Sequence, residues 1–302
     1  MILTVTLNPA VDKTCTISSL IRGKVNRLSG TRSIAGGKGV NVTKILRQFD
    51  FAVTAMGFLG GYTGRMIEEA LKKQGADCRF VHIKGETRVS TNILETDGCV
   101  TEILEPGPIV SEQELRSFLG EYDSQLECCE LVVLSGSAPK GVPVDIYRRL
   151  TELAKARGRK VFLDTSGELL RAAVAAGPYM IKPNRQELEY LSGKRLETME
   201  ALEEEAVRLL DKGVEKVVVS MGEDGLLYVD RTQRCVRRPP RIRAVNTVAC
   251  GDAVVASFCM SELEGRDEET AVRTAVALSA ANATTAVSAE IPMDTYLEFL
   301  KR

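Results

Sequence analysis

Short apolar runs alternate with amphipathic stretches along most of the chain. A continuous run such as Leu131–Ser135 predicts a strand buried on both faces of a sheet, and helical periodicity follows it at Ile146–Arg157. This alternation is typical of an α/β fold with a central, mostly parallel sheet flanked by helices. The strands expected on this basis are Ile2–Leu7, Ala52–Gly57, Leu131–Ser135, Val161–Asp164, Met180–Lys182 and Lys216–Ser220, with an edge hairpin at Leu226–Val229 and Arg234–Arg237.

A second group of shorter segments predicts β-structure outside that sheet. Residues 14–34 are broken by glycines and are too polar for a core helix. Three further alternating segments are Cys78–His82, Val89–Leu94 and Val100–Leu104. We expect one domain over residues 1–302, with a small β-sheet lid formed by about residues 12–34 and 78–105. A sheet with an uncovered face and free edges also predicts pairing with a second copy of the chain, a homodimer through the lid.

Composition narrows the class of protein. The 302 residues are 44% hydrophobic, and their formal net charge of -1 gives no field that would attract nucleic acid or an acidic membrane. The N-terminus has no targeting segment, so we expect a cytoplasmic protein. The 8 cysteines are scattered and there is 1 histidine, His82. Acid–base chemistry therefore falls to Asp, Glu, Lys or Cys.

The stretch Ala35–Val42 carries the first candidate chemistry. Three glycines in four positions let the backbone approach a ligand closely, and a helix is expected directly behind them. A lysine and an asparagine in the same stretch suit phosphate and hydroxyl groups. The candidate binding residues here are Gly36, Gly37, Lys38 and Asn41.

The stretch Val248–Asp252 is the second candidate binding site, because a tight turn there precedes the apolar run of a buried helix. The start of a helix presents free N–H groups and attracts phosphate. Asp252 is either the N-cap of this helix or a carboxylate aimed at a hydroxyl group. Asp12 and Ser137 each follow a predicted strand, where open α/β sheets bind ligands, although both also suit ordinary turns.

These two stretches together, AGGKGVNV and a V-x-x-GD segment, resemble the ribokinase-like, or PfkB, carbohydrate kinases. Further motifs resemble the ketohexose-phosphate kinases, a branch that contains 1-phosphofructokinase and tagatose-6-phosphate kinase. They occur in the family's order from Leu3 to about Ser288 and read TLNPAVD, GGKGVNV, GETR, TEILEPGP, SGSAPKG, KPN and SMG. The resemblance implies a ribokinase-like fold and transfer of phosphate from ATP, with Mg²⁺, to a ketohexose phosphate.

The resemblance also implies a role for each matching residue. Asp252 would remove the proton from the attacking hydroxyl, and the N–H groups of Ala249, Cys250 and Gly251 would hold the transferring phosphoryl group. Asp12 and Asn41 would fix sugar hydroxyls over Gly36 and Gly37. Phosphate on the sugar would meet Lys38, Arg88, Arg27 and Ser137. ATP would bind at Lys182, Asn184, Ser220, Gly222 and Gly225, and Mg²⁺ near Asn184 and Glu187 through water.

One departure from the family pattern affects the anion-binding turn. The family writes glycine where this chain has Ala249, and Cys250 stands where it has Ala or Ser. If the first position needs a positive φ, Ala249 adds strain of about 1 kcal/mol or more. A thiol at a helix start also invites a lowered pKa and oxidation, although Cys250 is expected to act through its backbone.

Fructose 1-phosphate is the substrate that the resemblance favours, and tagatose 6-phosphate is the alternative. A kinase for an unphosphorylated sugar or nucleoside is a further possibility, against which Lys38 and Arg88 argue. A regulator that binds sugar phosphate without turnover is another, against which Asp252, Asn184 and Glu187 argue.

Overall fold

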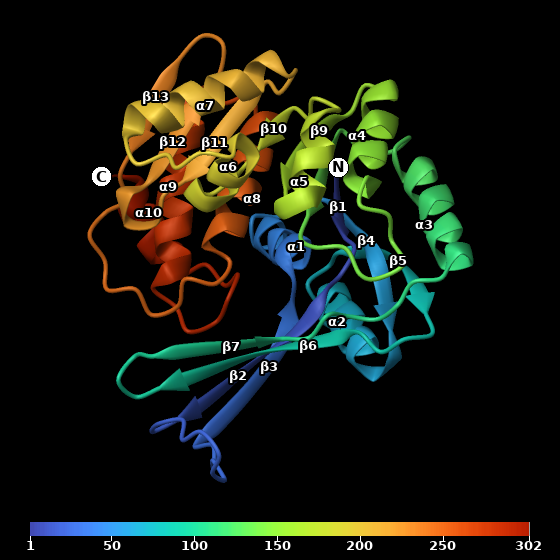
Figure 1. The fold of residues 1–302 in the computed structure, drawn as a ribbon, viewed down its shortest axis with the longest axis vertical. Helices are drawn as coiled ribbons and strands as arrows, with labels where there is room; N and C mark the ends of the chain where they lie inside the picture. Colours follow the sequence, from blue (N-terminus) through green and yellow to red (C-terminus); the bar gives the residue numbers. More distant parts are fainter. Residues whose placement is uncertain (302) are drawn as a thin grey trace.

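A nine-stranded sheet forms the centre of the molecule in the computed structural model, which describes residues 1–301 (Figure 1). All neighbouring strands are parallel except at one edge, where the last two strands are antiparallel. In spatial order the strands are β13 (Arg234–Arg237), β12 (Leu226–Val229), β11 (Lys216–Ser220), β10 (Met180–Ile181), β9 (Lys160–Asp164), β8 (Leu131–Ser135), β1 (Ile2–Thr6), β4 (Val53–Gly60) and β5 (Asp77–Ile83). The predicted α/β architecture and its edge hairpin are therefore confirmed.

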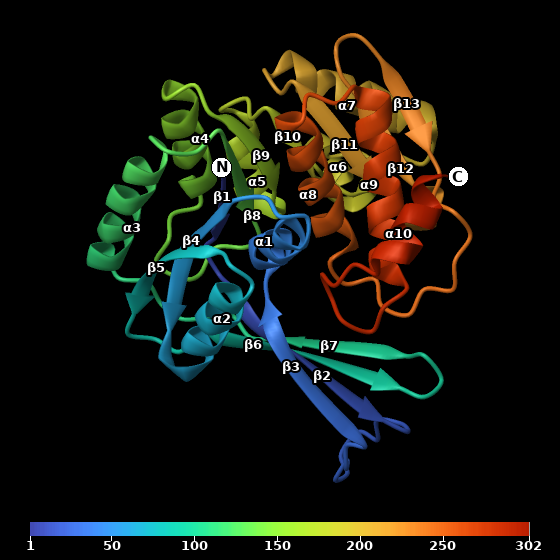
Figure 2. The ribbon, with the colours of Figure 1, turned by 180° about the vertical axis from the view of Figure 1, so that it is seen from behind.

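Helices cover both faces of this sheet, as the two opposite views show (Figures 1 and 2). One face packs against α3 (Glu112–Gln125), α4 (Ile146–Ala156), α5 (Gly167–Val174), α6 (Arg185–Ser192) and α7 (Met199–Asp211). The other carries α1 (Lys38–Gln48), α2 (Gly61–Lys73), α8 (Cys250–Leu263), α9 (Glu268–Ala283) and α10 (Met293–Leu300). Both cores are built mainly from Val, Leu, Ile and Ala. None of the helices within residues 1–301 is long and apolar enough to cross a bilayer.

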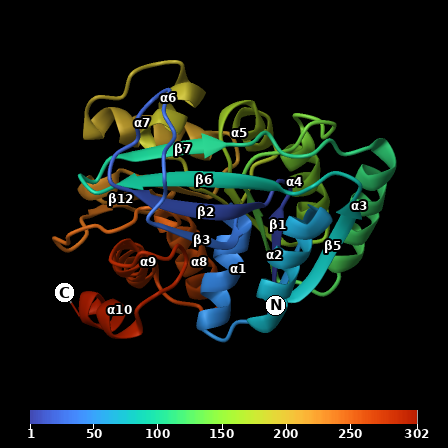
Figure 3. The same ribbon diagram turned by 90° about the horizontal axis from the view of Figure 1, so that it is seen from below.

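A separate four-stranded sheet, here called the small sheet, lies across one end of the molecule (Figure 3). Its strands are β3 (Gly30–Gly36), β2 (Ala10–Ile17), β6 (Arg88–Glu95) and β7 (Val100–Leu104), in that order. One expectation about it is wrong. Cys78–His82 belongs to β5, which pairs in parallel with β4 at the edge of the large sheet. Alternating polarity fits either sheet, because β5 is a partly exposed edge strand.

The small sheet joins the body where the parallel strands end. Three residues separate the end of β1 from β2, and β3 runs directly into the turn before α1. Helix α1 packs against α8, so the starts of these two helices face the same space. The carboxyl ends of the large sheet, the two helix starts and the small sheet thus surround one region, which is where open α/β sheets bind ligands.

Candidate active site

The turn before α8 has the conformation of an anion-binding site. Ala249 is the N-cap residue, with φ of 67° and ψ of 4°. This is the left-handed region, in which alanine is strained. The N–H of Cys250 donates to the Thr247 carbonyl at 3.3 Å. Contrary to expectation, this N–H is therefore not free to bind a ligand. The N–H groups of Ala249 and Gly251 find no acceptor within residues 1–301 and are available to a ligand.

Asp252 lies in the first turn of α8 and is not its N-cap, so that interpretation is wrong. Its carboxylate is buried and accepts a hydrogen bond from Asn41 Nδ2 at 2.9 Å. Burial raises the pKa of Asp252 to about 6, against the opposing effect of the Lys38 ammonium. A carboxylate with this pKa is ionised at neutral pH and still basic enough to accept a proton from a hydroxyl group.

Two lysines share one buried carboxylate beside this turn. Asp164, at the end of β9, is fully buried, and its Oδ1 lies 2.9 Å from Lys38 Nζ and 3.4 Å from Lys182 Nζ. Burial alone would raise the pKa of Asp164, but Lys182 and Lys38 outweigh it and lower that pKa. A Cβ added to Gly251 would lie 3.1 Å from Lys182 Nζ. The Lys182 ammonium therefore adjoins the free N–H groups of the turn.

Asp12 approaches the glycine turn from the small sheet. A Cβ at Gly36 would lie 1.9 Å from Asp12 Oδ2, so only glycine fits there. Burial raises the pKa of Asp12 to about 6, although Lys44 and Arg88 both lower it. The Gly37 N–H also lowers the pKa of the Asp12 carboxyl group. The structure thus places Asp12 directly against the Gly36–Gly37 turn.

Arg88 begins β6 on the same side of the site. Its guanidinium donates to the Asn8 carbonyl at 3.3 Å and to the Glu105 carbonyl at 3.2 Å. The Asn8 side chain in turn donates to Ser137 Oγ at 3.2 Å. Arg88, Asn8 and Ser137 thus form one polar group at the junction of the small sheet and the body.

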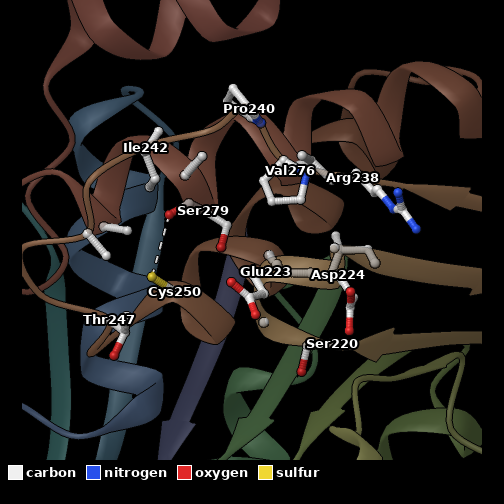
Figure 4. Close-up of a pocket in the computed structure, with 18 of the residues that line it drawn as sticks. Ser220, Glu223, Asp224, Arg238, Pro240, Ile242, Thr247, Cys250, Val276 and Ser279 are labelled. Atoms are coloured by element: carbon white, nitrogen blue, oxygen red, sulfur yellow. Dashed lines mark hydrogen bonds between the residues drawn. The ribbon is translucent and has the colours of Figure 1, made fainter.

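A cavity of about 1040 Å³ opens on the other side of the α8 turn (Figure 4). Polar and backbone groups of Ser220, Gly222 and Gly225 line one side, and apolar side chains such as Val276 and Ile242 line another. Gly225 has φ of 96°, and a Cβ there would lie 2.0 Å from the Arg237 carbonyl oxygen. The volume and the mixed lining suit a nucleotide.

Cys250 also borders this cavity, and its environment differs from the expectation. Its thiol donates to the Ser279 carbonyl at 3.5 Å and accepts from Asn282 Nδ2 at 3.4 Å. Burial raises the pKa of Cys250, because desolvation of a thiolate outweighs the hydrogen bonds with Asn282 and Ser279. The lowered pKa considered for Cys250 is therefore wrong.

Asn184 and Glu187 form a capping box at the start of α6. The Glu187 N–H donates to Asn184 Oδ1 at 2.8 Å, and the Asn184 N–H donates to Glu187 Oε2 at 2.8 Å. Within residues 1–301 the second carboxylate oxygen of Glu187 accepts no hydrogen bond, and no cluster of three or more metal-binding side chains occurs. One carboxylate oxygen of Glu187 is left free, and such an oxygen can hold a hydrated cation through a water molecule.

The family model described as "pfkB family carbohydrate kinase" matches residues 4–295 of this chain. The chain belongs to this family. Two curated relatives are both named 1-phosphofructokinase. The one from Bacillus subtilis (strain 168) is 35% identical over 300 residues, which cover 99% of this chain and 97% of the relative. The one from Xanthomonas campestris pv. campestris is 38% identical over 283 residues, which cover 92% and 89%.

Solved structures agree with the assignment of this carbohydrate kinase. Phosphofructokinase-2 from Escherichia coli in complex with potassium has a TM-score of 0.92 at 27% identity and covers 100% of this chain and 99% of that one. Arabidopsis thaliana ribokinase, in complex with ribose and ATP, has a TM-score of 0.80 at 23% identity and covers 99% and 98%. The fold of the kinase is therefore ribokinase-like, as expected.

The structure brings most of the expected residues of this kinase together, with one exception and two additions. Arg27 lies exposed in the loop between β2 and β3, away from the other site residues. Asp164 and Asn8 belong to the candidate site but were not predicted from the sequence. Each ends or directly follows a predicted strand, so position at a strand end was the signal that would have found them. Asp12, expected in a turn after the first strand, lies within β2.

Proposed function

We propose that this kinase transfers the γ-phosphoryl group of ATP to fructose 1-phosphate and yields fructose 1,6-bisphosphate. The observation that carries the proposal is the position of Asp252. Its buried carboxylate adjoins two free N–H groups of the α8 turn, between the nucleotide-sized cavity and the group formed by Asp12, Asn41 and Arg88. The names of the curated relatives support fructose 1-phosphate as the acceptor.

Asp252 acts as the base of the transfer. Its carboxylate accepts the proton of the attacking sugar hydroxyl as the new O–P bond forms and the bond from phosphorus to the leaving oxygen of ADP breaks. Asn41 holds the carboxylate through its hydrogen bond, so the base is oriented before substrate binds. The N–H groups of Ala249 and Gly251, with the Lys182 ammonium, stabilise the negative charge of the phosphoryl oxygens during transfer.

Mg²⁺ accompanies ATP in this proposal and neutralises part of the charge on its phosphates. Glu187 would hold water molecules of the hydrated ion through its free carboxylate oxygen, while Asn184 keeps Glu187 in place by the capping box. ATP itself would occupy the cavity lined by Ser220, Gly222 and Gly225.

The phosphate already on the sugar would bind to Arg88, with Ser137 and Lys38 beside it. The Arg88 guanidinium uses two of its donors on backbone carbonyl groups and keeps others for a ligand. The ammonium of Lys38 makes one ion pair with Asp164, and its side chain remains 40% exposed. Asp12 would bind sugar hydroxyl groups over the Gly36–Gly37 turn.

A coupled assay of ADP release tests this function over a panel of fructose 1-phosphate, tagatose 6-phosphate, fructose and tagatose. We expect fructose 1-phosphate to have the highest kcat/KM, at least about a hundredfold above free fructose, because charge-assisted bonds contribute about 1.5–3 kcal/mol each. A higher value for tagatose 6-phosphate would support the alternative substrate. Equal use of fructose and fructose 1-phosphate would overturn the phosphosugar assignment.

The small sheet also supports a homodimer. Large apolar side chains are exposed on it and on the loop at its tip, among them Val25, which is 84% exposed, and Leu104, which is 61% exposed. Pairing of two small sheets would cover such side chains and the open strand edges. We expect a dimer in sedimentation at micromolar concentration, whereas a monomer there would contradict this assembly.

A further inference from the structure

Lys44 is a buried cation that the proposed reaction does not use. It lies on α1 with a side chain that is 6% exposed, and its ammonium donates to the Ser288 carbonyl at 2.8 Å and to the Ala35 carbonyl at 3.3 Å. An ammonium ion is costly to bury, so such a residue persists where its charge or its bonds are needed. The positions of its two acceptors suggest what Lys44 does.

The Ser288 side of Lys44 leads to the anion-binding turn. Ser288 Oγ accepts from Asn246 Nδ2 at 3.1 Å, and Asn246 Oδ1 accepts from the Val248 N–H at 2.9 Å, one residue before the strained Ala249. Gln48, one turn further along α1, contacts the loop that follows Ser288, because its side chain donates to the Ala289 carbonyl at 2.8 Å. The loop 288–291 therefore supports the turn and is itself held by α1.

The Ala35 side of Lys44 leads to Asp12. The Ala35 carbonyl belongs to the peptide bond that joins Ala35 to Gly36, and the Asp12 carboxylate presses against Gly36. Four groups act on Asp12 electrostatically or by hydrogen bonding: Lys44 from α1, Arg88 from β6, Glu102 from β7 and the N–H of Gly37. The carboxylates that act on Lys44 are those of Asp12, Glu290 and Asp252.

We propose that Lys44 is a positioning residue that couples the two sides of the site. Through Ser288 it supports the turn that holds the phosphoryl group, and through its charge beside Gly36 it keeps Asp12 ionised for sugar binding. The second part rests on the proposed role of Asp12 in binding sugar hydroxyl groups. Of the opposing charges near Asp12, Lys44 is the one that favours its ionised form most strongly.

The direction of the pH effect follows from the sign of the charge. Burial already raises the pKa of Asp12 to about 6, and Lys44 opposes that rise. Removal of the Lys44 charge should therefore raise the pKa of Asp12 further, so that a larger fraction of it is protonated near neutral pH. Sugar binding would weaken first at the acidic end of the pH range.

The test compares Lys44→Met with Gln48→Leu by kcat/KM for fructose 1-phosphate from pH 5.5 to pH 8 (about that range suffices to span the titration of Asp12). Both variants release the loop, but only Lys44→Met removes a charge. We expect the acidic limb of Lys44→Met to move up by about one pH unit, which makes kcat/KM about four- to fivefold lower near pH 6.5 than at pH 8. Gln48→Leu should keep the wild-type limb.

Two further variants separate the loss of the Lys44 charge from the loss of its hydrogen bonds. Lys44→Gln keeps hydrogen-bond donors without charge and should move the limb as Lys44→Met does. Lys44→Arg keeps the charge and should leave the limb in place. Equal losses at every pH in Lys44→Met and Gln48→Leu would reduce Lys44 to a structural anchor and overturn the proposal.

A direct titration separates this proposal from the proposed reaction. The Asp12 carboxyl carbon can be followed by NMR in ¹³C-labelled protein without substrate, with Asp12→Asn to assign the signal. A higher midpoint in the Lys44→Gln protein supports the coupling even if fructose 1-phosphate is not a substrate. An unchanged midpoint contradicts the coupling, whatever the protein phosphorylates.

Discussion

The two ends of the candidate site are formed by different kinds of residues. The end where we propose phosphate transfer is made of buried charges: Asp252, Asp164 and Lys182 are each no more than 5% exposed, and each has a named polar partner or charged neighbour. The end that we propose for the nucleotide is an open cavity of about 1040 Å³, formed by glycine turns and aliphatic side chains. Charges that are buried and paired depend strongly on one another, because loss of one leaves its partner uncompensated.

This difference predicts how substitutions act in each region. At the transfer end, a change of one side chain should alter the ionisation or position of its neighbours and so reduce turnover. At the α8 turn the groups that we propose to bind the phosphoryl group are backbone N–H groups, so side-chain changes there should matter little unless they change φ.

The largest effect is expected for Asp252→Asn. The amide cannot accept the hydroxyl proton, so kcat should fall by roughly 10²–10⁴-fold while ATP binding is preserved. Steady-state kinetics with ATP titrations measure both quantities. A variant that keeps more than about a tenth of wild-type kcat would assign Asp252 a structural role only.

A smaller but clear loss is expected for Asp164→Asn. Lys38 and Lys182 would lose their shared carboxylate, and the donor beside the transferring phosphoryl group would be misplaced. We expect kcat to fall by about ten- to a hundredfold, the equivalent of one charge-assisted bond. Asp123→Asn, which removes an exposed ion pair with Arg157, is the matched control and should change kcat less than about twofold. Equal effects of the two substitutions would deny the Lys–Asp–Lys group any part in transfer.

Arg88→Leu should affect one class of substrate selectively. For fructose 1-phosphate we expect kcat/KM to fall by about ten- to a hundredfold, whereas turnover of free fructose should stay nearly constant, since free sugar never used the cation. The ratio of the two values in wild type and variant measures this directly. Parallel losses on both sugars would mean that Arg88 supports the fold and not the phosphate.

The smallest effect is expected for Ala249→Gly. Glycine adopts φ of 67° without the strain that alanine carries, so the free energy of unfolding should rise by up to about 1 kcal/mol. Because the N–H groups keep their positions, kcat should change less than about twofold. Urea denaturation and steady-state kinetics check the two parts. A loss of stability in this variant would show that the turn gains nothing from a residue suited to positive φ.

The fold was largely predictable because strand and helix periods are local properties of the sequence. Buried strands such as Leu131–Ser135 and Lys216–Ser220 were predicted with their observed bounds. The assignment of β5 to the small sheet failed, since sequence pattern does not say which strand a partly exposed strand pairs with. Pairing across a sheet depends on the whole topology.

Positions at a helix start were predictable, because Asn41 and Asp252 lie in the first turns of α1 and α8 as the apolar periodicity indicated. The site was not predictable where function depends on contacts between distant segments. The sequence around Asp164 does not indicate that Lys38 and Lys182 share its carboxylate. The raised pKa of Cys250 likewise depends on burial against α9, which outweighs the hydrogen bonds with Asn282 and Ser279.

The central claim is that the Asp252 carboxylate is the base that accepts the hydroxyl proton when ATP phosphorylates fructose 1-phosphate. The most direct test is the pH dependence of kcat/KM below neutrality, in wild type and in Asp252→Asn. In the structure, burial raises the pKa of both Asp252 and Asp12 to about 6. Activity requires the ionised form of each, so it should be lost as the pH falls through that value.

Ionisation of the substrates is common to both proteins and cancels in the comparison. The account predicts that the acidic limb of log kcat/KM is steeper in wild type than in Asp252→Asn by about one proton, because the variant retains Asp12 alone. Limbs of equal slope and midpoint in the two proteins would contradict it, since the titration of Asp252 would then have no part in the reaction.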